Sequence, residues 1–254
     1  MPKSEQLSLD SVRGFITFLS FSGNGHSLIS SMLDAHENII ISREVKILKH
    51  IYNGSDRDKM LKEIINHSKQ YSAKGRPHKG SNTSHFVEGQ LNGSAKRLKF
   101  LGDKNGYGTV HQVLYYKNFF KKCEALLRMP IIPIHIYRNP FRVVEHTRRF
   151  YSFRNIDDTA TKVSERFHKV RRSLSRVKNA VSIKFENILC STDKTLLDLF
   201  KPLGIRPSDK FLGGCRSIIT SIDEPPVMWT PKSIKLINEL CSSISYLNGY
   251  RYES

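Results

Sequence analysis

A glycine-rich turn between two apolar segments is the first candidate for chemistry. The apolar run 15–21 predicts a buried strand, and apolar residues recur at helical spacing between Leu28 and Leu33. Glycines let the chain turn so sharply that backbone N–H groups converge, and the positive end of the following helix dipole points to the same place. The predicted anion site consists of Ser22, Gly23, Asn24, Gly25, His26, Ser27 and Leu28.

An arginine at the end of another predicted strand offers a second anion ligand. Residues 130–137 predict a central strand that runs into Arg138, Asn139 and Pro140. We expect the Arg138 guanidinium to lie beside the glycine turn, where it would bind a terminal phosphate in bidentate fashion. The alternative is an arginine paired with a carboxylate at the edge of the sheet.

The glycine turn disfavours a nucleoside-triphosphate loop and does not match the dinucleotide-binding pattern. A nucleoside-triphosphate loop requires Lys after its second glycine, where this chain has His26. The dinucleotide-binding pattern requires a third glycine, where this chain has Leu28.

A carboxylate and a lysine follow two further predicted strands. The short strand 39–41 leads into Ser42, Arg43 and Glu44, and the strand 97–102 is followed by a turn that contains Lys104. Ligands of open parallel sheets bind at the carboxyl ends of the strands, so Glu44 is placed where chemistry can occur. As isolated residues, Glu44 is a surface carboxylate and Lys104 a turn lysine.

The elements that position these residues alternate between strand and helix. A fifth strand is expected at 180–185 and a Gly-Gly turn at 213–214. Helices are expected at 45–52, 56–70, 109–122, 141–150, 157–178, 192–203 and 231–247. The pattern predicts a three-layer α/β fold with a mostly parallel sheet of about five strands flanked by helices. We expect a short tail at 1–13, one domain at 14–254 and a flexible loop at 71–94.

Composition restricts the partners. There are 41 Lys and Arg against 23 Asp and Glu, a net charge of +18, which favours anionic partners or a basic solvated surface. The four cysteines form no C-x-x-C pair, and no metal-binding motif is present. The N-terminus has no apolar signal core and no stretch reaches membrane-spanning length, so we expect a cytoplasmic protein without a membrane span.

Four segments in order resemble the sulfotransferases that use 3′-phosphoadenosine 5′-phosphosulfate (PAPS). They are FSGNGHSLISSMLDAHENI, IHIYRNPFRVVEHT, IKFENILCSTDKTLLDLFKPLGI and WTPKSIKLINELCSSISYLNGY. The motifs are most similar to the tyrosylprotein and carbohydrate branches. The resemblance implies a P-loop nucleoside-triphosphate-hydrolase-like fold, PAPS as donor, its desulfated product PAP, no metal, and a carbohydrate or protein tyrosine hydroxyl as acceptor.

The resemblance also implies roles for single residues. Glu44 would be the general base, Lys104 would stabilise the sulfuryl group, and the glycine turn would hold the 5′-phosphosulfate. The 3′-phosphate would be bound by Arg138, by His146 or Thr147, and by Arg216 from a late loop. In the 71–94 loop, Lys74, Arg76, His78 and Lys79 suit an anionic acceptor.

The chain departs from the family at Gly23, where a Lys or Arg usually contacts the phosphosulfate. Either His26, Lys46 or Lys104 replaces that cation, or the sulfotransferase activity is weak. The alternative function is a catalytically degenerate protein that binds a nucleotide or a polyanion. A second alternative, which we disfavour, is a nucleic-acid binder that uses the basic helix 157–178.

Overall fold

The computed structural model describes residues 8–77, 84–150, 155–219 and 227–252 of the chain. Within these residues, five strands form one sheet in the order β2-β3-β1-β4-β5, and all neighbouring strands are parallel. The strands are β1 (Gly14–Leu19), β2 (Ile39–Arg43), β3 (Phe100–Lys104), β4 (Ile131–Tyr137) and β5 (Val181–Lys184). The predicted α/β fold with a parallel sheet of about five strands is confirmed.

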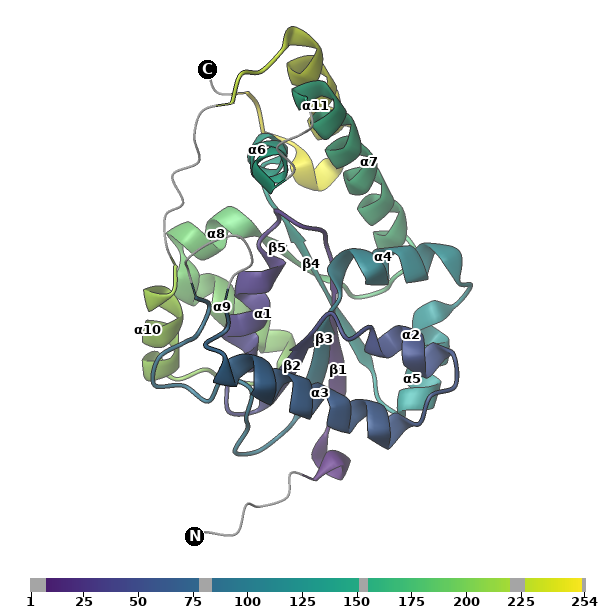
Figure 1. Cartoon of the computed structure of the whole chain (residues 1–254), viewed down its shortest axis with the longest axis vertical. Coiled ribbons are helices and arrows are strands. Elements are labelled where there is room, and N and C mark those ends of the chain that lie inside the picture. Colours follow the sequence, from purple (N-terminus) through teal and green to yellow (C-terminus); the bar gives the residue numbers. More distant parts are fainter. Residues whose placement is uncertain (1–7, 78–83, 151–154, 220–226, 253–254) are drawn as a thin grey trace.

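Helices cover both faces of the sheet, which makes three layers (Figure 1). On one face lie α1 (His26–Asp34), α8 (Phe185–Cys190), α9 (Thr192–Phe200) and α10 (Asp209–Ser217). On the other face lie α2 (Ile47–Tyr52), α4 (Gly106–Tyr115), α5 (Phe119–Leu127), α6 (Pro140–Phe150), α7 (Ile156–Leu174) and α11 (Pro231–Ser243). Helix α3 (Arg57–Ala73) packs along the edge strand β2. The 3₁₀ helices are η1 (Leu9–Ser11), η2 (Lys201–Leu203) and η3 (Ser245–Leu247).

The core explains why β1 reads as a continuous apolar run. All of its residues are buried, as is typical of a strand covered on both faces. Successive side chains point to opposite faces, so Phe15 and Leu19 enter one core while Ile16 and Phe18 enter the other. Because the strands are parallel, the residues that follow β1, β2, β3 and β4 lie at the same end of the sheet.

The third strand lies later than predicted, at Phe100–Lys104 instead of 97–102. Asp103 and Lys104 continue the ladder opposite Ser42 and Arg43 of β2. Both residues are charged and yet buried. Because a charged residue does not continue an apolar pattern, the sequence predicts that the strand ends before Asp103.

Four other predicted elements differ from the structure, two of them only in where the helix ends. The helix 109–122 is two helices, interrupted where Asn118 adopts a φ of 53°. The residues Gly213 and Gly214 lie inside α10, where a side chain on Gly214 would come within 3.0 Å of Val87. Helix α11 ends at Ser243 because Ile244 is extended. Helix α7 ends at Leu174, four residues earlier than predicted.

The described parts of the 71–94 loop are tied to the core. Helix α3 continues to Ala73, and beyond it the buried Arg76 forms an ion pair with the wholly buried Asp34. Arg76 is therefore not available to an acceptor, contrary to prediction. His78 and Lys79 lie outside the described residues, and the flexibility of the loop stays a prediction.

Candidate functional site

The glycine turn connects β1 to α1 and has the backbone shape that an anion site requires. Gly23 and Gly25 have φ values of 96° and 87°, which side-chain-bearing residues rarely adopt. A Cβ on Gly25 would lie 2.0 Å from the ring of Phe185, so this position accepts only glycine. Helix α1 begins at His26, and the N–H groups of Leu28 and Ile29 donate to Gly25 O, which leaves those of His26 and Ser27 for an anion at the start of the helix. Leu28 is packed in the core, and its backbone N–H donates to Gly25 O at 3.1 Å within the turn itself.

Arg138 lies against the same turn, as predicted for its position. The buried Asn24 joins the two segments, since its Oδ1 accepts the Arg138 N–H at 3.1 Å and its Nδ2 donates to Phe21 O at 3.2 Å. Arg138 Nη1 donates to Gly23 O at 3.4 Å, and the guanidinium lies 5.3 Å from the ring centre of Phe185. The ends of β1 and β4 thus bring the two expected anion ligands together.

The neighbouring helix α6 places His146 beside this turn and carries Thr147 as the next residue. A Cβ on Gly23 would lie 3.4 Å from His146 Cδ2. The hydroxyl of Thr147 is buried and has no hydrogen-bond partner among the described residues. Buried polar atoms nearly always have a partner, so this hydroxyl is a candidate hydrogen-bonding group for a ligand.

On the other side of the turn, Lys104 and Glu44 form an ion pair. Lys104 Nζ lies 2.7 Å from Glu44 Oε1 and 3.5 Å from Ser27 Oγ, so the ammonium connects the carboxylate to the glycine turn. The Lys104 side chain is 2% exposed and that of Glu44 62% exposed. Burial lowers the pKa of Lys104, and the charge of Glu44 opposes this shift.

His26 occupies the start of α1 as an uncharged group. Burial and the cations of Lys104 and Arg43 lower the pKa of His26 well below its usual value, and His146 adds to the shift. Its Nδ1 has no hydrogen-bond partner among the described residues. In the free protein, His26 therefore does not supply the positive charge that is missing at Gly23.

Arg216 is not placed as predicted. It lies on α10 instead of in a loop, and its guanidinium forms an ion pair with Asp193 at the start of α9. Lys46 is an exposed residue in the turn before α2, with a φ of 63°. Ser22 is exposed at the rim of the glycine turn.

Sequence reasoning missed two arginines near the site. Arg43, at the end of β2, lies over the ring of Tyr71 at 5.1 Å, and its charge lowers the pKa of both His26 and Lys104. Arg166, on α7, lies over the rings of Tyr107 and Phe21 at 5.4 and 5.9 Å. The position of Arg43 at the end of a strand could have placed it at the site from the sequence alone. For Arg166, the sequence indicates only that it belongs to a basic helix.

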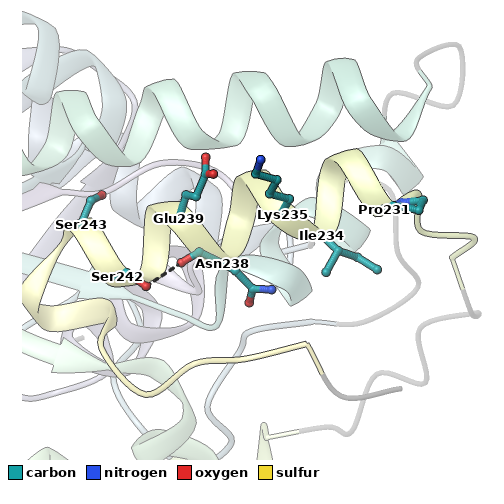
Figure 2. A pocket seen from close by; sticks show the side chains of 7 residues that line it. All are labelled: Pro231, Ile234, Lys235, Asn238, Glu239, Ser242 and Ser243. Carbon is teal, nitrogen blue, oxygen red and sulfur yellow. Dashed lines mark hydrogen bonds between the residues drawn. The ribbon is translucent and has the colours of Figure 1, made fainter.

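A hollow on the molecular surface lies elsewhere. Figure 2 shows it along α11, lined by Pro231, Ile234, Lys235, Asn238, Glu239, Ser242 and Ser243. No residue of the predicted site is among them. In the described part of the chain, no group of three or more His, Cys, Asp or Glu residues could hold a metal ion. No described helix combines the length and apolar character needed to cross a bilayer.

The chain matches no family model and no curated protein. Its fold matches solved sulfotransferase structures. The sulfotransferase domain from the curacin biosynthetic pathway is 15% identical, with a TM-score of 0.50 over 90% of this chain and 98% of that one. The sulfotransferase domain of the Synechococcus PCC 7002 olefin synthase is 12% identical, with a TM-score of 0.51 over 93% and 96%.

A third structure, mouse sulfotransferase SULT7A1 complexed with PAP, is 14% identical, with a TM-score of 0.52 over 94% of this chain and 89% of that one. These similarities extend over almost the whole of each chain. The protein therefore has the sulfotransferase fold, in agreement with the predicted P-loop-like architecture. The likeness to the tyrosylprotein branch stays a prediction.

Proposed function

We propose that the protein transfers a sulfuryl group from PAPS to a hydroxyl group of an acceptor. The observation that carries this proposal is the placement of an anion-binding turn between a guanidinium, Arg138, and an ion pair, Lys104–Glu44. The shared fold supports it, and one neighbour of that fold is a sulfotransferase complexed with PAP.

In this proposal, the donor lies across the carboxyl ends of β1 and β4. The turn from Ser22 to Ser27 holds the 5′-phosphosulfate through its backbone N–H groups. Arg138 binds the 3′-phosphate, with His146 or Thr147 as a further donor. The Thr147 hydroxyl and His26 Nδ1 are buried atoms without a hydrogen-bond partner in the part of the chain that the structure describes, and such a ligand would supply one.

The chemical step is an in-line displacement at sulfur. The acceptor oxygen forms a bond to sulfur while the bond from sulfur to the bridging oxygen breaks, and PAP leaves with the electron pair. Glu44 takes the proton of the acceptor hydroxyl. Lys104 balances the negative charge that grows on the sulfuryl and bridging oxygens. Such electrostatic stabilisation, together with positioning, dominates catalysis in loose transition states of this type.

We further propose a carbohydrate or protein tyrosine hydroxyl as the acceptor. The exposed carboxylate of Glu44 leaves room for a large acceptor, and Arg43 gives its surroundings a positive charge that suits an anionic one. Transfer of labelled sulfate from PAPS to desulfated polysaccharides, acidic tyrosine peptides and simple alcohols tests the proposal. Transfer that is absent from every acceptor would contradict it.

A binding-only function is the second candidate, and two observations favour it. Gly23 supplies no cation, and burial and the charges of Lys104 and Arg43 lower the pKa of His26 well below its usual value, which disfavours its charged form. Calorimetry with PAP separates the candidates, since tight binding without turnover on any acceptor supports the binding protein. Sulfate transfer supports the enzyme.

A further inference from the structure

A buried carboxylate, Asp103, holds the turn that carries Glu44. Only 2% of Asp103 is exposed, although its side chain is a carboxyl group and it is the last residue but one of β3. Its Oδ1 accepts the Ser42 hydroxyl at 2.9 Å and the Val45 N–H at 3.2 Å, and its Oδ2 accepts the Ile47 N–H at 3.1 Å. The carboxylate thus binds the strand before Glu44 and the helix after it.

The turn needs such a support because its backbone is strained. Glu44 and Lys46 have φ values of 60° and 63°, in the left-handed region that non-glycine residues avoid. Strained conformations of this kind persist only where the surroundings determine them, and they gather at functional sites. Without Asp103, the Ile47 N–H would also lose its partner in a buried position.

Consecutive residues of β3 hold Glu44 in two different ways. The Lys104 carbonyl accepts the Glu44 N–H at 3.1 Å, and Lys104 Nζ binds the Glu44 carboxylate at 2.7 Å. Asp103 binds the Ser42 hydroxyl before Glu44 and the backbone N–H groups of Val45 and Ile47 after it. Together the two residues fix both the backbone and the side chain of the base.

We propose that Asp103 is a positioning residue that aims the Glu44 carboxylate at the acceptor hydroxyl, an inference that rests on the proposed function. It touches neither substrate. Its removal should leave donor binding intact, since the glycine turn and Arg138 lie on other strand ends. It should slow the proton transfer, which depends on a placement accurate to about 1 Å.

Asp103→Asn tests this inference with little change in shape. The amide keeps one acceptor oxygen but turns an NH₂ group toward a backbone N–H, so part of the turn is released. We expect kcat to fall roughly tenfold to a hundredfold, with the KM for PAPS unchanged. The matched control is Glu124→Gln, because Glu124 also accepts a strand N–H, that of Ile131 at 2.9 Å, but at the far end of the sheet. The control should keep the wild-type kcat.

The combination with Glu44→Gln distinguishes positioning from general stability. If Asp103 acts through Glu44, Asp103→Asn should lower kcat in the wild-type background and hardly at all in the Glu44→Gln background. An equal loss in both backgrounds, or no loss in the first, would overturn the inference. If Asp103→Asn does not fold, Ser42→Ala removes only one bond to the carboxylate and should give a smaller loss with the same dependence on Glu44.

Hydrogen exchange tests whether Asp103 holds the turn, and it does not require an active enzyme. If the wild type transfers no sulfate, that absence would refute only the proposed function. The amides of Val45 and Ile47 should exchange faster in Asp103→Asn than in Glu124→Gln, while the amides of β1 stay protected in both. Unchanged exchange at Val45 and Ile47 would show that the carboxylate does not hold the turn.

Discussion

The buried ammonium of Lys104 lies 2.7 Å from the exposed carboxylate of Glu44. Because Lys104 also lies 3.5 Å from Ser27 of the glycine turn, one side chain connects the proposed base to the proposed donor site. This arrangement lets a single cation orient Glu44 and meet negative charge that develops on the donor.

The first prediction concerns Glu44 itself. Glu44→Gln keeps the shape of the side chain but removes the basic oxygen, so kcat should fall by about 10² to 10⁴ while PAP binding is preserved. The control is Glu37→Gln, an exposed glutamate 3.8 Å from Lys96 on the surface, which should leave turnover unchanged. Steady-state rates with labelled PAPS check both variants, and turnover that survives Glu44→Gln would remove Glu44 from the mechanism.

The second prediction concerns Arg138. An arginine that binds a phosphate contributes about 1.5 to 3 kcal/mol through charged hydrogen bonds, so Arg138→Ala should weaken PAP binding roughly tenfold to a hundredfold. Arg142→Ala is the control, because Arg142 is exposed on the adjacent helix and pairs with Glu145. Calorimetric titration with PAP measures both, and equal affinities in the two variants would contradict a phosphate site at Arg138.

The third prediction separates crowding from backbone strain in the glycine turn. Gly25 and Gly54 have similar φ values of 87° and 90°, but only at Gly25 would a Cβ meet a neighbour, the ring of Phe185. Gly25→Ala should therefore lower the free energy of unfolding by about 1 to 3 kcal/mol more than Gly54→Ala does. Urea unfolding of the two variants gives the difference, and equal losses would mean that the Phe185 contact is not close.

The fold was predictable from sequence to the extent that burial followed the apolar pattern. Strand β1 and the start of α1 were visible because their burial on both faces requires an unbroken apolar run and helical spacing. The sequence did not show where β3 ends, because Asp103 and Lys104 are charged residues. They are buried because Ser42 of β2 and Glu44 of the turn after β2 bind them.

The candidate site was predictable where its residues follow strands. Arg138 and Glu44 were found because the carboxyl ends of parallel strands meet at one edge. Arg166 comes from the middle of a helix, and its contact with Tyr107 depends on how α7 packs on α4, which no local pattern encodes. The pairing of Arg76 with Asp34 was hidden for the same reason, since 41 intervening residues separate them.

The fourth prediction tests that buried pair. Both side chains are at most 2% exposed, and Asp34 also accepts the Ile41 N–H and the Ser68 hydroxyl. Arg76→Leu leaves an uncompensated charge inside the protein, so the free energy of unfolding should fall by about 3 to 5 kcal/mol. The exposed Arg97 provides the control Arg97→Leu, which should change stability by about 0.5 kcal/mol or less. Similar urea midpoints for the two variants would contradict the buried pair.

The fifth prediction is that donor binding takes up a proton at His26. In the free protein, burial and the cations of Lys104 and Arg43 lower the pKa of His26, which favours a neutral ring at about pH 7. A phosphate group in the glycine turn brings negative charge beside the ring and raises that pKa. Binding is then favoured at low pH, and affinity should fall as the pH rises through the pKa of the bound state.

Calorimetry of PAP binding in two buffers with different ionisation enthalpies measures this uptake at about pH 7. Because the phosphates of PAP titrate in the same range, the relevant quantity is the difference between the wild type and His26→Asn. We expect the wild type to take up more protons than the variant, by at most one per site, and to lose more affinity between about pH 6 and about pH 8. Identical proton uptake in the two proteins would show that His26 stays neutral, and the missing charge at Gly23 would then have to come from Lys104 and Arg43 alone.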